Sequence, residues 1–118
     1  LMTHGEQQAV SAYEVKLDGD GSSADIVSRG VARDSSFQKL DLGIIGNAVC
    51  SGHTECDSII MDNGRILAVP SLEANSTEAQ LIHEAAIGKI AGDQLNKLMT
   101  LGLTEAEAEE QIINGFLR

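Results

Sequence analysis

Two strands joined by a polar turn are predicted by Val10-Ser-Ala-Tyr-Glu-Val-Lys-Leu17, Asp18-Gly-Asp-Gly-Ser-Ser23 and Ala24-Asp-Ile-Val-Ser-Arg-Gly-Val-Ala32. Further short apolar stretches follow at residues 40–45, 58–61, 66–69 and 80–87. Turn-forming residues separate them, namely Asn47, Asp62-Asn63-Gly64, Pro70 and Asn75-Ser76-Thr77. No strict period links the stretches, so the pattern indicates a sheet-rich body but does not by itself predict a repeat architecture.

The pattern changes from strand to helix after Ile90. Asp93 is expected to cap a short helix, and Gly102 is expected to end that helix in the left-handed conformation. Thr104 and Glu107 form a Thr-x-x-Glu capping box at the start of a second helix. We therefore predict a β-rich body over residues 1–90 and a helical subdomain over residues 91–118, in which two short helices form a hairpin.

The composition of the chain excludes several classes of partner. With 118 residues, of which 42% are apolar, the chain can bury one hydrophobic core. Its net charge of −10 repels nucleic-acid phosphates and anionic lipids, and its aromatic side chains are one tyrosine and two phenylalanines. No run of about 18 apolar residues is present for a membrane span. We expect neither nucleic acid nor a membrane as a partner.

The two cysteines, Cys50 and Cys56, are too few for a disulfide-bonded secreted domain, and no targeting segment precedes them. We therefore expect a cytoplasmic protein whose thiols are reduced. The chain begins Leu1-Met2-Thr3 and leads almost directly into strand-like sequence, which suggests an excerpt of a longer protein.

Three side chains are candidate iron ligands: Cys56 in Ser51-Gly-His-Thr-Glu-Cys-Asp57, and the pair His83 and Glu84. Thiolate suits iron–sulfur chemistry, and imidazole and carboxylate suit iron in more open sites. Strand alternation sends His83 to one face and Glu84 to the other, so the two cannot chelate one ion together without a bulge. The spacing of Cys50 and Cys56 does not match the tight pairs of closed zinc or cluster sites.

The same residues also have structural interpretations. Cys56 fits a small buried hydrophobe, and His83 with Glu84 fits the rim of a sheet. The roles of Cys50 and His53 stay open. Strand alternation would place His53 and Glu55 on one face, but Cys50-Ser-Gly-His resembles a turn, so the alternation is not secure there.

Motifs typical of other chemistries are missing. The stretch from Asp18 to Ser23 shares residues with a calcium loop, but Ser23 stands where the loop needs glycine and Arg29 where it needs glutamate. The chain has neither a phosphate-binding Gly-x4-Gly-Lys-Ser/Thr loop nor a Gly-x-Ser-x-Gly elbow. No convergent set of carboxylates and histidines is visible, so we do not expect an enzyme.

Several blocks, taken in order, resemble the SufB/SufD family of iron–sulfur cluster assembly proteins. They are Ser28-Arg-Gly-Val-Ala32, Ser51-Gly-His-Thr-Glu-Cys-Asp57 and His83-Glu-Ala-Ala-Ile-Gly-Lys-Ile90, followed by Asp93-Gln-Leu95, Leu98-Met-Thr-Leu-Gly-Leu103, Glu105-Ala106 and Ile112-Ile-Asn-Gly-Phe116. The resemblance covers roughly residues 10–118. It implies the C-terminal rungs of a right-handed parallel β-helix followed by a small helical hairpin, as the C-terminal part of a longer protein.

The resemblance also implies a role. Family members work with SufC, an ABC-type ATPase, and pair through their β-helices in a scaffold on which clusters are built. The SufB residues associated with cluster formation fall on Cys56, His83 and Glu84. We therefore expect Cys56 and His83 to bind iron or a nascent iron–sulfur cluster transiently at a subunit interface, with a second SufB/SufD-like subunit or a second copy completing the site.

The subtype stays open. SufD typically has glycine where Glu84 stands, which favours the SufB type, whereas SufB often has a further glutamate where Ile82 stands. The alternative function is a structural β-helix dimerisation module that has no metal ligands of its own. For the scaffold function, the resemblance implies that the helical hairpin from Asp93 to Leu117 is the ATPase docking surface. Exposed strand edges of a truncated β-helix also predict self-association.

Overall fold

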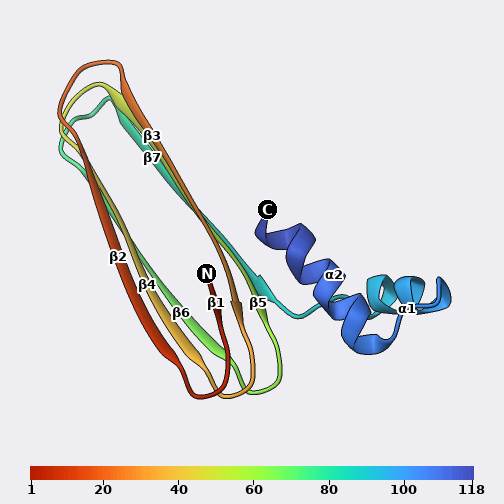
Figure 1. The fold of residues 1–118 in the computed structure, drawn as a ribbon. Helices are drawn as coiled ribbons and strands as arrows, with labels where there is room; N and C mark the ends of the chain where they lie inside the picture. The colour runs from red at the N-terminus through yellow and green to blue at the C-terminus, as the bar shows by residue number, and fades with distance from the viewer.

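The computed structural model describes residues 1–118, which form seven strands and then two helices (Figure 1). The strands are β1 (Met2–Thr3), β2 (Gln8–Leu17), β3 (Ser22–Ala32), β4 (Phe37–Gly46), β5 (Cys50–Ile60), β6 (Arg65–Ala74) and β7 (Ala79–Gly88). The helices are α1 (Gly92–Thr100) and α2 (Glu105–Leu117). Neither helix is long and apolar enough to cross a membrane.

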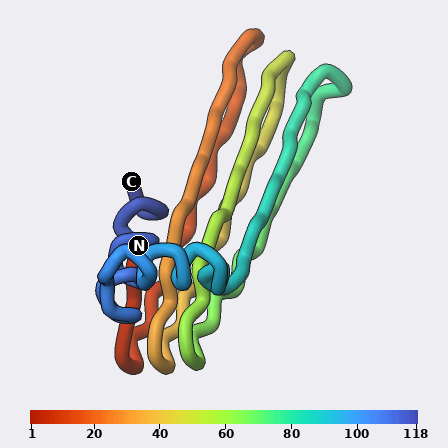
Figure 2. Tube along the Cα trace, turned by 90° about the vertical axis from the view of Figure 1, so that its right-hand side faces the viewer, coloured from red at the N-terminus to blue at the C-terminus, as the bar shows by residue number.

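The strands coil into a parallel β-helix with two facing sheets. One sheet has the order β1-β3-β5-β7 and the other β2-β4-β6, and every pairing is parallel. Successive turns of the coil lie side by side in Figures 1 and 2. Paired residues are 28 or 29 positions apart, as in Ser22, Cys50 and Ala79. The mainly β, parallel β-helical fold with a following helical hairpin is therefore confirmed.

The repeat is geometric, and this explains why it has no sequence period. Ser22, Cys50 and Ala79 occupy equivalent places although their side chains differ in chemistry. One full turn of the coil contains either 28 or 29 residues. A search for recurring residue types at one fixed spacing therefore finds nothing.

The middle turn of the coil carries most of the core. Burial alternates along β4 and β5, because one face of each strand meets the interior and the other meets solvent. Two small apolar clusters result, one formed by Leu17, Ile44 and Cys50 and the other by Leu40, Leu42 and Cys56. Burying each large aliphatic side chain contributes about 1.5–3 kcal/mol.

The last turn is uncovered. Inward positions on β6 and β7 remain accessible, with Leu72 39% and Ile87 43% exposed. After β7 the chain runs back along the sheet, so that the helices lie beside the first turns rather than over the last one (Figure 2). Arg29 in β3 donates a hydrogen bond to the carbonyl oxygen of Arg118 at 2.7 Å. The end formed by β6 and β7 therefore has no cover within this chain.

The corners of the coil are stacked as regularly as its strands. At one corner Gly5, Asp34 and Asp62 all adopt positive φ values, of 58°, 56° and 56°. The carboxylate of Asp34 accepts from the amide of Gly5 at 2.8 Å, and that of Asp62 accepts from the amide of Asp34 at 3.4 Å. Glycine and aspartate tolerate this left-handed backbone, so residue choice and corner geometry agree.

Two predicted strand boundaries were wrong. The stretch from Cys50 to His53 is strand rather than turn, since its backbone pairs with both β3 and β7. Pro70 does not end a strand, because β6 continues through it to Ala74. β6 is an edge strand of its sheet, where a residue that lacks an N–H is tolerated.

The helical signals were mostly right. Thr104 and Glu107 form the predicted capping box, and Gly102 has a φ of 99°. Asp93 is not the cap of α1; Ala91 holds that position and makes no side-chain hydrogen bond. Asp93 instead lies in the first helical turn, where its charge interacts favourably with the helix dipole.

Candidate functional site

Cys56 and His83 lie on the same inner face of the coil. Thr54 pairs with His83, and Cys56 pairs with Ala85, so His83 is one strand and two residues away from Cys56. Alternation along β5 and β7 directs both side chains inward. The sequence-based prediction that His83 and Glu84 occupy opposite faces is confirmed.

The Cys56 thiol is fully buried as a free cysteine. It packs against Leu40 and Leu42, and its Sγ lies 3.6 Å from the hydroxyl of Ser58. Its neighbour on the last turn is the small and exposed Ala85. Cys56 therefore lies one turn below the uncovered end, beneath a side chain that occupies little space.

His83 belongs to the last turn itself and is half-buried. Its Nδ1 lies 2.6 Å from the hydroxyl oxygen of Thr54, a residue with no solvent exposure. This is the one side-chain hydrogen bond of His83, so Nε2 has no partner in the chain. A thiol and an imidazole nitrogen thus share the inner face next to the open end.

Glu84 takes part in a different arrangement, on the outer face of the same sheet. His53 lies between two carboxylates there, with Nδ1 2.9 Å from Asp25 Oδ1 and Nε2 3.7 Å from Glu84 Oε2. Asp25, His53 and Glu84 come from three successive turns of the coil, on β3, β5 and β7. The hydrogen bond to Asp25 raises the pKa of His53, and the charges of Asp25 and Glu84 add to this effect.

The structure therefore divides the sequence-predicted residues. Cys56 and His83 share the inner face as diagonal neighbours on adjacent strands, whereas Glu84 lies on the opposite face. No group of three or more His, Cys, Asp or Glu side chains is arranged to hold a metal ion. Cys56 and His83 together amount to two candidate donors, which is half of a tetrahedral set.

Sequence reasoning missed Thr54 and Asp25. Thr54 is 29 residues from His83, and Asp25 is 28 residues from His53. Nothing local in either segment signals the contact. Only the register of the coil brings these residues together, and the sequence did not reveal that register.

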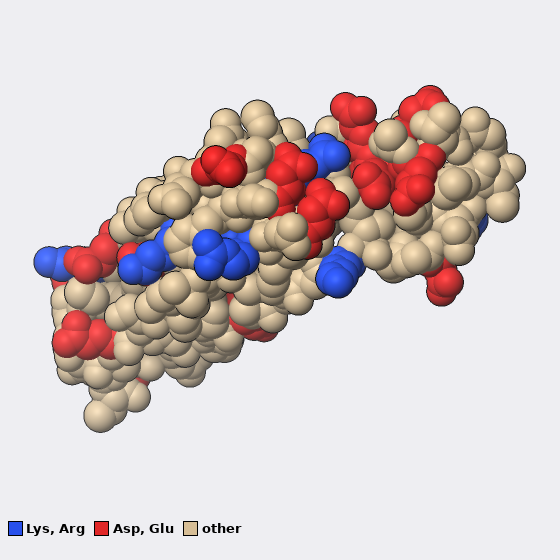
Figure 3. All heavy atoms as spheres, turned by 90° about the horizontal axis from the view of Figure 1, so that it is seen from below, with Lys and Arg blue, Asp and Glu red and all other residues tan.

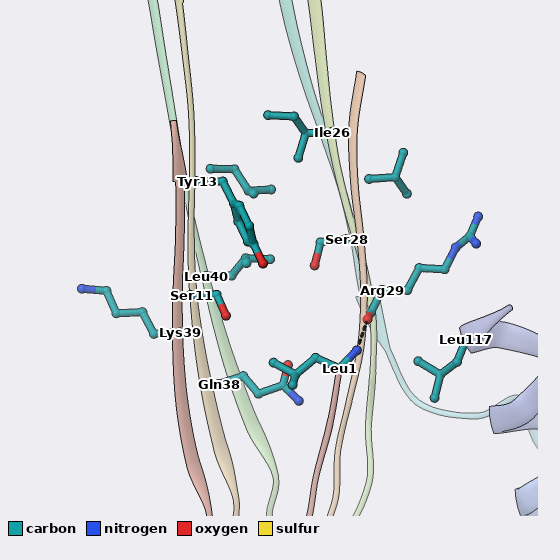
Figure 4. A pocket seen from close by; sticks show the side chains of 12 residues that line it. Leu1, Ser11, Tyr13, Ile26, Ser28, Arg29, Gln38, Lys39, Leu40 and Leu117 are labelled. Carbon is teal, nitrogen blue, oxygen red and sulfur yellow. Dashed lines mark hydrogen bonds between the residues drawn. The ribbon is translucent and has the colours of Figure 1, made fainter. Parts of the chain in front are cut away.

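The largest cavity lies at the other end of the coil. It has a volume of about 550 Å³ and opens over the first turn (Figure 4). Inward side chains of β2 and β3, among them Ser11, Tyr13, Ile26 and Ser28, line it, and neither Cys56 nor His83 does. The Leu1 amino group closes one side by donating to the carbonyl oxygen of Arg29 at 2.9 Å. This cavity contains no thiol or imidazole that could bind iron.

Charge is distributed unevenly over the molecule. On the face that Figure 3 shows, a group of acidic side chains lies at the helical end, and several basic side chains lie along the β-helix. In α2 the acidic residues are Glu105, Glu107, Glu109 and Glu110. The helical hairpin thus carries a cluster of acidic side chains on α2.

These features define a class: a short parallel β-helix with a thiol and an imidazole beside its open end and an acidic helical hairpin. Comparison with known proteins gives the family. The model of the SufBD core domain of the SUF system for FeS cluster assembly matches residues 1–116. This chain belongs to the SufB/SufD family of iron–sulfur cluster assembly proteins.

Individual relatives agree with this assignment. A SufBD family iron–sulfur cluster assembly protein of Methanothermobacter thermautotrophicus is 46% identical over 106 residues, covering 87% of this chain and 26% of that protein. Another from Methanocaldococcus jannaschii is 41% identical over 104 residues, covering 87% of this chain and 33% of that protein. The iron–sulfur cluster assembly protein SufB of Bacillus subtilis is 32% identical over 122 residues, covering 99% of this chain and 26% of that protein. The chain spans about a quarter to a third of the length of these relatives.

Proposed function

We propose that this chain is part of an iron–sulfur cluster assembly scaffold in which Cys56 and His83 hold iron or a nascent cluster. The observation that carries the proposal is their position on one inner face, next to an end of the coil that nothing in the chain covers. Iron and the cluster are cargo here. Thiolate and imidazole are suitable donors for both.

A second subunit completes the donor set. Two donors cannot saturate iron, and the open end exposes both inward side chains and the unpaired backbone edges of β6 and β7. A second copy or a SufB/SufD-like subunit placed against this end would cover Leu72 and Ile87 and bring its own donors close to His83. Glu84 faces the other way, so we assign it to the subunit interface rather than to the ion that His83 binds.

The helical hairpin from Asp93 to Leu117 is the proposed docking surface for an ABC-type ATPase of the SufC kind. Met99 is 40% exposed and Leu101 is 75% exposed, and the neighbouring helix α2 carries four acidic side chains. The chain has no phosphate-binding loop, and we assign nucleotide hydrolysis to the partner and a non-enzymatic role to the chain itself. We place the complex in the cytoplasm, where both free thiols stay reduced.

Anaerobic reconstitution with iron and sulfide tests the ligand assignment. We expect Cys56→Ala and His83→Ala, made in the full-length protein, to lose most of the cluster absorbance of the wild type. Cys50→Ala is the matched control, because Cys50 is a buried thiol on the same face of the same strand but in the other apolar cluster. Equal absorbance in all four proteins would refute the ligand role.

A structural dimerisation module is the second candidate. The observation that favours it is the complete burial of Cys56 between Leu40 and Leu42, as expected for a small apolar side chain. In that case Cys56→Ala would lower stability and leave both cluster loading and dimer mass unchanged. Measuring mass and iron content on the same samples separates the two functions.

A further inference from the structure

We infer that Thr54 is the positioning residue for His83: its hydroxyl binds Nδ1 and so makes Nε2 the metal-binding atom. The inference rests on the proposed function, because it concerns the same imidazole. Thr54 lies on the neighbouring turn of the coil and is not itself proposed as a ligand.

The geometry of the contact is well defined. Thr54 Oγ1 lies 2.6 Å from His83 Nδ1, and the two residues are direct partners in the register of β5 and β7. Thr54 has no solvent exposure, so water does not compete for its hydroxyl. Its β-branched side chain has restricted freedom at χ1, which holds the oxygen in place.

The chemistry of imidazole gives the contact its consequence. A neutral ring carries one proton, on Nδ1 or on Nε2, and it can bind a metal only through the nitrogen that lacks the proton. When Nε2 binds iron the proton must be on Nδ1, and the Thr54 oxygen then accepts a hydrogen bond from that N–H. When no metal is bound, the proton can move to Nε2, and the Thr54 hydroxyl then donates to Nδ1.

A hydroxyl suits this task because it can both donate and accept. The contrast is His53, whose Nδ1 faces the Asp25 carboxylate and whose pKa is raised by that contact, so that the charged imidazolium is favoured. An imidazolium has no free lone pair for a metal. Thr54, unlike Asp25, places no negative charge beside its imidazole.

The test compares Thr54→Val, which keeps the shape and removes the hydroxyl, with Thr54→Ser, which keeps the hydroxyl. Both are made in the full-length protein, and Thr54→Ala is a second hydroxyl-free variant if valine prevents folding. Nitrogen-15 NMR of the His83 ring, without metal and at one pH, should show a hydrogen-bonded Nδ1 in the wild type and Thr54→Ser. We expect that signature to be lost in the hydroxyl-free variants, which a role in packing alone would not produce.

Anaerobic titration with Co²⁺, used as the probe for the thiol and imidazole donors, gives the second readout. Loss of an outer-shell partner typically weakens metal affinity about 10–100-fold, and we expect Thr54→Val to fall in that range while Thr54→Ser stays within about threefold. Unchanged affinity in Thr54→Val together with a loss in His83→Ala would overturn the role of Thr54 and leave the proposed function standing. Unchanged affinity in His83→Ala would overturn both.

Discussion

Asp25 and His53 form a hydrogen-bonded pair across two turns of the coil, with Asp25 Oδ1 2.9 Å from His53 Nδ1. Glu84 on the next turn lies 3.7 Å from the other ring nitrogen. The outer face of the sheet therefore carries an imidazole between two carboxylates, and its charge depends on pH. On the inner face, Cys56 and His83 lie beside hydroxyl groups instead.

The first prediction concerns this pair. The pKa of His53 is raised above its ordinary value of 6.5, chiefly by the hydrogen bond to Asp25. Because the pKa of His53 is raised in the folded state, protonated His53 stabilises the fold. This stabilisation is fully present below pH 6.5 and is lost as the pH rises through the raised pKa of the folded state. Asp25→Asn should return the pKa of His53 toward 6.5 and flatten this part of the stability profile. NMR titration of His53 and thermal unfolding across neutral pH measure the two effects.

Asp41→Asn is the matched control for Asp25→Asn, since Asp41 lies on the other sheet. It should leave the pKa of His53 and the pH profile as they are in the wild type. An unchanged pKa of His53 in Asp25→Asn would contradict the pairing.

The second prediction concerns access to Cys56. Ala85 pairs with Cys56 and is exposed at the open end, so Ala85→Leu should add bulk over the buried thiol and hinder access from this end without disturbing a packed core. We expect iron loading and thiol labelling to decrease severalfold while thermal stability stays near that of the wild type. Ala86→Leu adds the same bulk on the opposite face and should load iron normally. Full loading of Ala85→Leu would show that iron does not reach Cys56 from this end.

The third prediction concerns the open end as an interface. Leu72 points inward on the last turn and is 39% exposed, whereas Val69 on the same strand points outward and is 40% exposed. A lysine that must be buried in an interface is strongly unfavourable, so Leu72→Lys should shift the protein toward the monomer. Val69→Lys should not. Light scattering across a concentration series reports the mass, and a dimer that survives in Leu72→Lys would place the interface elsewhere.

The sequence predicts those structural features that depend on residues close together in the chain. The opposite faces of His83 and Glu84 follow from strand alternation, and the capping box of Thr104 and Glu107 follows from a spacing of three residues. The contact of Thr54 with His83 follows from neither. It depends on the length of a whole turn of the coil, which is set by corners whose residues differ from turn to turn.

The same distinction explains the errors at Pro70 and Asp93. Proline usually separates strands, but β6 is the last strand of its sheet and tolerates it, and only the topology shows which strand is last. Aspartate is a favoured cap, yet the chain leaves β7 so that Ala91 takes the cap position two residues earlier. In both cases tertiary arrangement overrides a local preference.

The fourth prediction tests the stacking of corners that sets the turn length. A Cβ atom at Gly64 would lie 2.4 Å from the carbonyl oxygen of Ala32, a backbone atom of the preceding turn that cannot move independently. Gly64→Ala should therefore push two turns apart and lower the free energy of unfolding by about 1–3 kcal/mol, the usual range for overpacking. Gly88→Ala is the control, because nothing lies within 4 Å of its Cβ position, and its effect should stay within about 0.5 kcal/mol. Urea unfolding measures both variants. Equal stability of Gly64→Ala and the wild type would mean that the corners can separate without loss, and the register that joins Thr54 to His83 would then need another source of rigidity.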